Sequence, residues 1–173
     1  MSEKPLYVLL VEDSEEDAER IVGELIRSAY DVNVRRVQDS GSLIDALQEQ
    51  SWDVVLCDYE LPQLDGHDAI YIVREHLTLD TPFIFISKGV DAETAITLMQ
   101  AGAQDYVLKS NLGRLPVAVS REMDAAHTRR EKRLAHDKIE EQDRLLRQLL
   151  ASAPDAICFK DLQLRYLGLN QAE

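Results

Sequence analysis

The sequence predicts an α/β protein in which a doubly wound, five-stranded parallel sheet is followed by a long C-terminal helix. Three observations support this prediction. Short apolar runs recur along the first two thirds of the chain, amphipathic stretches separate them, and a highly charged stretch without glycine follows the last run. Strands that alternate with helices join into a parallel sheet through right-handed crossovers.

Five runs of residues are predicted to form the strands. The first, third and fourth are continuous apolar segments of the kind that a parallel sheet buries on both faces, whereas the second alternates and the fifth is short. The predicted strands are residues 6–11, 32–37, 52–57, 82–86 and 105–108. An amphipathic stretch follows each of the first four and is predicted to pack on the sheet as a helix.

Turn and capping residues mark the ends of these helices. Ser14, with Asp17 three residues later, is a candidate N-cap of the first helix, and Ser40 and Ser42 open the second. A loop at residues 62–66, which contains Pro, Asp and Gly, precedes the third helix. Gly102 is predicted to close the fourth, because glycine readily adopts the left-handed conformation that ends many helices.

Residues 117–150 hold 8 basic and 7 acidic side chains and neither Gly nor Pro, which favours one long exposed helix. Pro116 suits the first turn of such a helix. A heptad seam runs along it, in which Lys132 and Gln142 weaken an otherwise suitable coiled-coil interface. A parallel homodimer and a solitary signalling helix both fit this pattern, and His136 is interpreted as a solvated side chain. The seam consists of Ala125, Thr128, Lys132, Ala135, Ile139, Gln142, Leu146 and Leu149.

The acidic net charge of −13 belongs to residues 1–116, which hold 9 basic and 22 acidic side chains. This balance argues against nonspecific binding to nucleic acid or to an anionic membrane. No apolar stretch approaches the roughly 20 residues of a membrane span. Cys57 and Cys158 form neither a disulfide framework nor a CxxC motif, so we expect a cytoplasmic location. Cys57 is predicted to be a small core side chain.

Polar groups end the apolar runs. Since ligands bind at the carboxyl edge of an open parallel sheet, these groups should converge on one crevice. Carboxylates that share a site repel one another unless a cation is present, and hard oxygen ligands favour Mg²⁺. The combination predicts phosphoryl transfer onto Asp58, with Lys109 in contact with one phosphoryl oxygen. The five residues are Glu12, Asp13, Asp58, Ser87 and Lys109.

Four motifs extend this interpretation. They are V-L-L-V-E-D-S at 8–14, D-V-V-L-C-D-Y-E-L-P at 53–62 with D-G at 65–66, F-I-S at 85–87, and A-G-A-Q-D-Y-V-L-K at 101–109. Through them, residues 5–116 resemble the receiver domain of bacterial two-component response regulators. The resemblance implies a flavodoxin-like fold that takes a phosphoryl group from the histidine of a sensor kinase or a phosphotransfer protein.

The resemblance also implies a role for individual residues. Asp58 would be the phosphoacceptor, and Lys109 would contact the phosphoryl group. Ser87 would be the hydroxyl that turns toward it, and Tyr106 the aromatic ring that reorients, although an aromatic side chain in a short strand is also suited to simple packing. Mg²⁺ would be held by Glu12, Asp13, Asp58 and the main-chain carbonyl of Glu60.

Two residues depart from the pattern of that family. Lys88 follows the switch hydroxyl where the family usually has Ala or Gly, so a long cation could shield Asp58 or add a phosphate contact. It also fits a solvated loop. Ser110 stands where the family often has Pro after the lysine, which leaves open whether the Lys109–Ser110 bond is cis.

The C-terminal residues 149–173 resemble the opening of a PAS sensory domain, through L-L-A-S-A-P-D-A-I-C-F-K-D-L-Q-L-R-Y-L-G-L-N-Q-A-E. The predicted organisation is therefore a receiver at 1–116, a helical linker at 117–150 and the start of a PAS domain at 151–173. Two short strands without an opposing sheet make no stable core, so we expect the chain to be part of a longer protein. The resemblance implies a histidine kinase or diguanylate cyclase as the output.

Two other classes of function remain open at this point. A degenerate receiver would act as a phosphorylation-independent binding module, and an aspartyl-phosphate phosphohydrolase would turn over free substrates. The phosphohydrolase requires a second aspartate two residues beyond the nucleophile, where Glu60 fits only in part. The prediction for this chain is a signalling module that is not itself an enzyme.

Overall fold

The computed structural model describes residues 4–28, 30–77, 80–89, 91–152, 158–163 and 165–169. The chain divides into two compact units, Met1–Arg129 and Arg130–Glu173. None of the described helices is long and apolar enough to cross a membrane.

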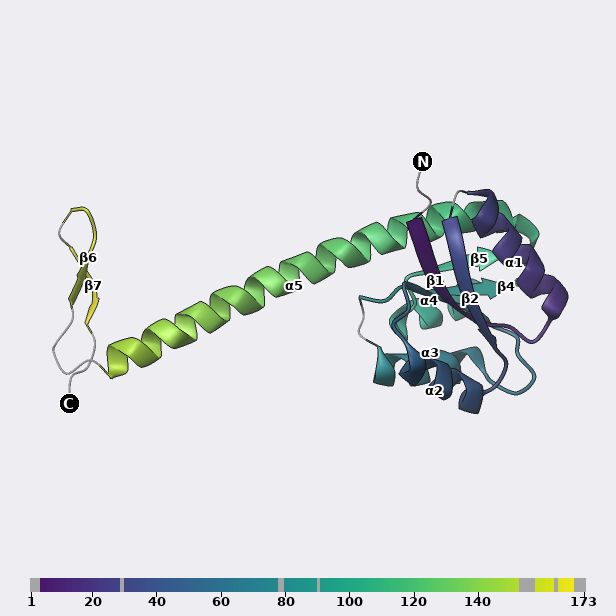
Figure 1. Cartoon of the computed structure of the whole chain (residues 1–173), viewed down its shortest axis with the longest axis horizontal. Coiled ribbons are helices and arrows are strands. Elements are labelled where there is room, and N and C mark those ends of the chain that lie inside the picture. The colour runs from purple at the N-terminus through teal and green to yellow at the C-terminus, as the bar shows by residue number, and fades with distance from the viewer. Residues whose placement is uncertain are drawn as a thin grey trace. The chain divides into compact units, whose positions relative to one another are not determined.

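The first unit is built on a five-stranded parallel sheet (Figure 1). The strand order is β2-β1-β3-β4-β5, which places the first strand beside the third and makes the chain reverse direction across the sheet. This arrangement confirms the predicted doubly wound α/β fold, with strand ends that differ from the predicted ones by two residues at most. The strands are β1 (Lys4–Val11), β2 (Tyr30–Val37), β3 (Val54–Asp58), β4 (Phe83–Ser87) and β5 (Asp105–Leu108).

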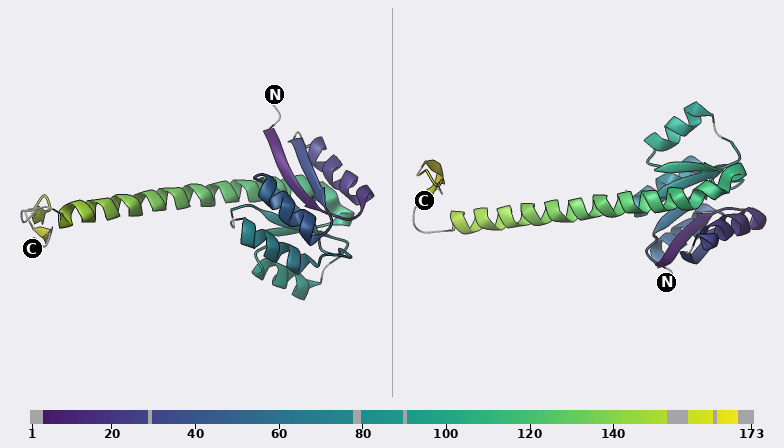
Figure 2. Two further views of the ribbon diagram at one scale, coloured as in Figure 1. Left: turned by 60° about the horizontal axis from the view of Figure 1, so that its bottom comes forward. Right: turned by 90° about the horizontal axis from the view of Figure 1, so that it is seen from above.

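Helices cover both faces of this sheet (Figure 2). Alternate residues of a strand point to opposite faces, so Leu9 and Val11 belong to one core and Val8 and Leu10 to the other. The first core is closed by α2 (Ser40–Glu49), α3 (Gly66–His76) and Leu98 of α4 (Ala92–Gln100). The second is closed by α1 (Glu15–Arg27) and the start of α5 (Leu115–Ala151).

The capping predictions hold at both ends of the first unit's helices. The Ser14 hydroxyl accepts a hydrogen bond from the Asp17 N–H at 3.2 Å, which starts α1 as expected. Gly102 has a φ of 107° just after α4, a conformation that favours glycine. Helix α2 begins at Ser40 as predicted, and its N-cap is the preceding residue, Asp39, which accepts from the Ser42 N–H at 2.9 Å.

The long helix is less exposed than predicted at its start. A 3₁₀ turn, η1 (Lys109–Arg114), precedes α5, and the first turns of α5 lie against the sheet. The prediction of an exposed helix from residue 117 onward is therefore wrong for Ala118, Val119 and Ala126, which are buried. Ala118 and Val119 complete the core beside α1, and all three residues belong to the first unit.

A buried carboxylate ties this part of the helix to the sheet. Asp105, at the start of β5, accepts from Nη2 of Arg114 at 3.0 and 2.9 Å and from Nη2 of Arg121 at 2.8 Å. The two guanidinium groups come from η1 and α5, so β5, η1 and α5 meet at one ion-paired centre. The fully hydrogen-bonded arrangement explains why a charged residue is tolerated inside the fold.

The second unit contains the rest of α5 and a hairpin. Its strands β6 (Cys158–Lys160) and β7 (Tyr166–Leu169) pair antiparallel, in agreement with the two short strands expected here. Residues 153–157 and 170–173, which carry part of the PAS resemblance, lie outside the described residues. Among the described residues no peptide bond is cis, so the Lys109–Ser110 bond is trans.

Candidate functional site

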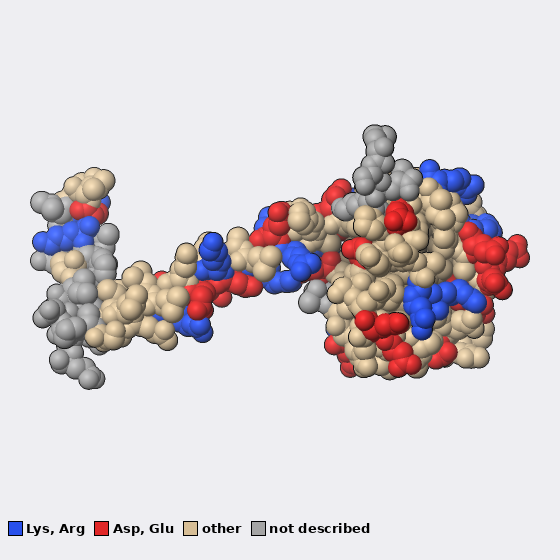
Figure 3. All heavy atoms as spheres, in the orientation of Figure 1, with Lys and Arg blue, Asp and Glu red and all other residues tan. Residues whose placement is uncertain are grey.

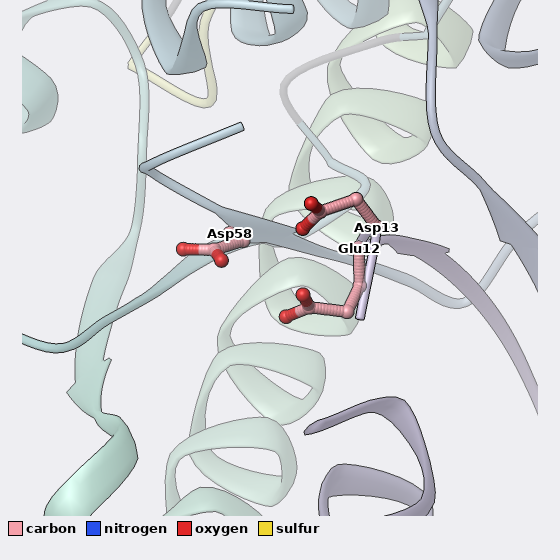
Figure 4. A group of neighbouring side chains, drawn as sticks. All are labelled: Glu12, Asp13 and Asp58. Atoms are coloured by element: carbon pink, nitrogen blue, oxygen red, sulfur yellow. The ribbon is translucent and has the colours of Figure 1, made fainter. Parts of the chain in front are cut away.

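Three carboxylates meet at the carboxyl edge of the sheet (Figure 4). Val11 of β1 pairs with Cys57 of β3, so the residues that follow in each strand, Glu12 and Asp58, lie side by side. An oxygen of each of these carboxylates and one of Asp13 lie within 4.8 Å of one another. Glu12 and Asp58 are buried and Asp13 is exposed, so the cluster reaches from the core to the surface. The structure thus confirms that these acidic residues converge.

The ammonium group of Lys109 completes the cluster. It follows β5 and donates to Glu12 Oε2 at 2.9 Å, to Asp58 Oδ2 at 2.7 Å and to Asp17 Oδ2 at 2.6 Å. Only 6% of its side chain is exposed. An ammonium group has three N–H donors, and here each has a carboxylate partner.

Burial and ion pairing act in opposite directions on these groups. Burial alone would lower the pKa of Lys109, but its hydrogen bonds to Asp17, Asp58 and Glu12 outweigh that effect and hold the pKa above its ordinary value. Burial raises the pKa of Glu12 even though Lys109 and the Ser14 N–H stabilise its charged form. The hydrogen bond from Lys109 lowers the pKa of Asp17, which is less buried. Lys109 therefore stays charged while it lies among the carboxylates.

The other predicted residues lie in the loop after β3, at the end of β4 and in β5. The second oxygen of Asp58, Oδ1, accepts from the Glu60 N–H at 3.1 Å, which fixes the loop that carries the Glu60 carbonyl. Ser87 ends β4, and its hydroxyl is hydrogen-bonded to the Gly89 backbone, accepting from N–H at 3.0 Å and donating to the carbonyl at 3.1 Å. Tyr106 is half-buried in β5 and packs against the core on the α2–α3 face. Their switching roles stay predictions.

A glycine at the start of α3 permits the loop after Asp58 to fold closely. A Cβ added at Gly66 would lie 2.8 Å from Cδ2 of the Tyr59 ring and 3.0 Å from the Phe85 ring. The two rings meet edge to face, with their centroids 6.0 Å apart. The D-G pair at 65–66 therefore serves the packing of the residue next to Asp58 as well as the N-cap of α3.

Sequence reasoning missed three residues that contact the cluster. Asp17 was recognised only as part of a helix cap, yet it makes the shortest contact of Lys109. Arg20 donates to the Lys109 carbonyl at 3.2 Å. Arg36 of β2 donates through Nη1 to the carbonyls of Glu12 at 3.3 Å and Asp13 at 3.1 Å. Asp17 and Arg20 are 92 and 89 positions away from Lys109 in the sequence, so no local sequence pattern could predict these contacts.

The donor set suits a small hard cation. Carboxylate oxygens from Glu12, Asp13 and Asp58 come together, and Asp13 is exposed, so the cluster is open to solvent on that side. Mg²⁺ is bound by one or two carboxylates together with waters and phosphate oxygens. The acidic cluster is therefore compatible with Mg²⁺.

Comparisons with known proteins agree with this geometry. Residues 8–120 match the response regulator receiver domain family. The chain is 32% identical over 104 residues to the autoinducer 2 sensor kinase/phosphatase LuxQ of Vibrio vulnificus, an alignment that covers 60% of this chain and 12% of LuxQ. It is 35% identical over 88 residues to the regulatory protein AtoC of Escherichia coli, covering 50% of this chain and 19% of AtoC. The chain thus spans a small part of these relatives.

Solved structures show the same fold. A response regulator structure from Chloroflexus aurantiacus matches with a TM-score of 0.57 at 27% identity, covering 68% of this chain and 99% of that one. The receiver domain of a Luxo repressor protein from Vibrio parahaemolyticus matches with a TM-score of 0.64 at 24% identity, covering 72% and 95%. With the family match over residues 8–120 and the acidic cluster beside Lys109, the chain belongs to the response regulator receiver domains of two-component signalling.

Proposed function

We propose that this receiver accepts a phosphoryl group on Asp58 from a histidine of a sensor kinase or of a phosphotransfer protein. The observation that carries the proposal is the 2.7 Å contact between the Lys109 ammonium and Asp58 Oδ2, beside the acidic pair Glu12 and Asp13. A buried carboxylate with a cation on one side and a metal-compatible cluster on the other is suited to an anionic phosphoryl group. Such sites act through positioning and electrostatics.

The transfer balances without an external acid or base. An oxygen of Asp58 forms a bond to phosphorus, and the P–N bond of the phosphohistidine breaks. The electron pair stays on that ring nitrogen, and the other ring nitrogen carries a proton, so the histidine leaves as neutral imidazole. Lys109, which contacts Asp58, holds one phosphoryl oxygen. Glu12, Asp13, Asp58 and the Glu60 carbonyl would hold Mg²⁺, which when bound would supply positive charge beside the transferring group. Ser87 leaves Gly89 to donate to a phosphoryl oxygen, and Tyr106 follows that movement.

The test uses beryllofluoride with Mg²⁺, because this complex mimics a phosphoryl group on a carboxylate. Binding to the full chain is followed by ¹⁹F NMR. We expect saturable binding to the unaltered protein, none in Asp58→Asn, and strongly weakened binding in Asp13→Asn. Glu75→Gln is a matched control, because Glu75 is an exposed carboxylate near the far end of α3, away from the carboxyl edge of the sheet.

The outcomes separate the alternatives. A folded chain that fails to bind beryllofluoride would be a degenerate receiver that acts as a binding module only. Steady turnover of small phosphate esters would instead identify a phosphohydrolase and contradict the assignment of this chain as a non-enzymatic signalling module.

The parts after the receiver are assigned by their sequence. The receiver at 1–116 is followed by a helical linker at 117–150 and by the start of a PAS domain at 151–173, which leads to a histidine kinase or diguanylate cyclase output. The β6–β7 hairpin supports a strand pair in this region. A cytoplasmic location follows from a sensor-kinase partner and from cysteines that form no disulfide framework.

The linker helix forms a parallel homodimer through its heptad seam. Ile139, Leu146 and Leu149 of the seam are 64%, 51% and 68% exposed, so their apolar surface is available to a second copy. Basic and acidic side chains alternate along this part of the helix (Figure 3). The side chains beside the seam are also complementary between the two helices. In a parallel pair, a residue that flanks the seam on one helix lies opposite the residue five positions later on the other helix. The facing pairs are Asp124 with Arg129, Glu131 with His136, Lys138 with Asp143, and Leu145 with Leu150.

A further inference from the structure

Asp17 stands apart from the other carboxylates that contact Lys109. It lies in the first turn of α1 and outside the group Glu12, Asp13 and Asp58 that is suited to a metal ion. Its side chain is 18% exposed, whereas Glu12 is fully buried. Its contact with Lys109 is nevertheless the shortest of the three, at 2.6 Å.

Asp17 belongs to a closed ring of contacts that holds both ends of Lys109. Asp17 Oδ2 accepts from the Lys109 ammonium, and Asp17 Oδ1 accepts from Nη1 of Arg20 at 3.0 Å. Nη2 of Arg20 then donates to the carbonyl of Lys109 at 3.2 Å. Helix α1 therefore contacts Lys109 at two points: the Asp17 carboxylate binds the ammonium group, and the Arg20 guanidinium binds the Lys109 backbone carbonyl.

The backbone of Asp17 is itself fixed. Its N–H donates to the hydroxyl of Ser14, the N-cap of α1, and Ala18 behind it is buried in the core beneath α1. A long, flexible lysine side chain loses rotamer freedom when it is held in one place. A rigid partner that has already ordered the side chain reduces that loss when a phosphoryl group binds.

Phosphorylation of Asp58 would affect the three contacts between Lys109 and its carboxylate partners differently. The oxygen that Lys109 contacts on Asp58 loses its negative charge, so that contact passes to a phosphoryl oxygen. Glu12 is a predicted Mg²⁺ ligand. Asp17 is neither the acceptor nor a predicted metal ligand, so it is the contact that keeps Lys109 in place throughout.

We propose that Asp17, supported by Arg20, is a positioning residue that aims the Lys109 ammonium at the phosphoryl group on Asp58. The proposal rests on the phosphoacceptor function above. Asp17 acts through Lys109, so its loss weakens the binding of a phosphoryl mimic more than it weakens the binding of Mg²⁺.

The experiment compares two affinities in the full chain. Mg²⁺ alone is titrated calorimetrically, and beryllofluoride is then titrated at saturating Mg²⁺ by ¹⁹F NMR. For Asp17→Ala we expect beryllofluoride binding to weaken about tenfold, the size of one charge-assisted hydrogen bond, while Mg²⁺ affinity changes far less. Asp17→Asn keeps an oxygen acceptor and should recover part of the loss.

Two further variants make the result specific. Glu16→Ala removes a neighbouring exposed carboxylate from the same turn of α1 and should leave both affinities unchanged. Arg20→Ala should weaken beryllofluoride binding less than Asp17→Ala. The double variant should lose less than the sum, because both residues belong to one ring.

Several outcomes overturn the proposal. Unchanged beryllofluoride affinity in Asp17→Ala would show that Lys109 needs no positioning. Tighter binding would show that Asp17 competes with the phosphoryl group for Lys109. An equal loss of both affinities would reveal a general effect of charge. These results leave the phosphoacceptor function standing as long as the unaltered protein binds beryllofluoride and Asp58→Asn does not.

Discussion

Lys109 and Cys57 lie near the same edge of the sheet and are both buried, but they differ in charge. The ammonium is paired with three carboxylates and remains charged. The Cys57 thiol is fully buried, and burial together with the nearby charge of Asp58 raises its pKa well above the ordinary value. It therefore stays a neutral thiol in the core, as its position one residue before Asp58 predicted, and it is a poor nucleophile.

Replacing Lys88 tests whether a positive charge next to Ser87 affects the rate of phosphoryl transfer to Asp58. It is exposed and immediately follows Ser87, where a cation can attract an incoming phosphoryl donor. Lys88→Ala should change the rates of phosphorylation and dephosphorylation by up to about fivefold, because an exposed ion pair contributes about 0.2–1 kcal/mol. Rates are measured with a small-molecule phosphodonor, and Lys4→Ala, on the opposite end of β1, is the control. Identical rates in both directions would show that Lys88 is only a solvated loop residue.

At the scale of elements, parallel pairing explains why local patterns predicted most of the site. The end of an apolar run is visible in the sequence, and the parallel register carries each end to the same edge of the sheet. Asp58 pairs with Ile86 of β4, so Ser87 comes one residue beyond it. Ser87 pairs with Leu108, so Lys109 comes one residue further along β5. The cluster therefore follows from strand order and register.

The helix caps predict a pH dependence of stability. Hydrogen bonds from the N–H groups of Ser42 and Thr94 lower the pKa values of Asp39 and Asp91 below the ordinary value of 3.8. A carboxylate with a lowered folded-state pKa stabilises the fold above its unfolded-state pKa, and this stabilisation is lost as pH falls through the folded-state pKa. The loss therefore begins near pH 4 and proceeds downward.

The measurement is thermal unfolding of single variants between pH 3 and 7. Asp39→Ala and Asp91→Ala should each lower the unfolding temperature at pH 7, and the difference from the unaltered protein should shrink toward pH 3. Asp45→Ala, on the exposed side of α2, is the control. A difference that stays constant over this range would show that the charge of the caps contributes nothing.

At the scale of the whole molecule, α5 belongs to two environments. Its first turns are part of the receiver core, through Leu115, Ala118 and Val119, whereas residues from Arg130 onward belong to the second unit. Asp105 ties the buried part to β5 through Arg114 and Arg121. These ion pairs therefore hold the start of β5 to the base of the helix.

The proposed dimer is tested by placing a charge in the seam. Ile139→Lys should raise the dissociation constant of the dimer by about tenfold or more, because it removes apolar burial and adds like charges in both copies. Leu134→Lys is a matched control, because Leu134 is similarly exposed, at 57% against 64% for Ile139, but lies off the seam. The association is measured by sedimentation equilibrium of the full chain.

Charge exchange across the seam distinguishes the parallel register from other pairings. Lys138→Glu should weaken the dimer, and the added Asp143→Lys should restore it, because these residues face each other in the parallel pair. A monomeric unaltered protein at all measured concentrations would exclude the dimer. A double variant weaker than Lys138→Glu alone would exclude this register.

The amino-acid sequence by itself determined the five strands, their order of appearance and the residues at their ends, because burial on both faces of a sheet leaves a continuous apolar run in the chain. The N-cap of α2, Asp39, is likewise a local feature, because it immediately precedes Ser40, where the helix was predicted to begin. Tertiary structure alone decided that Asp17, Arg20 and Arg36 contact the acidic cluster, and that Ala118, Val119 and Ala126 are buried. The physical reason is that a lysine's partners and a helix's buried face depend on which distant elements pack beside them, whereas propensity and capping act within a few residues.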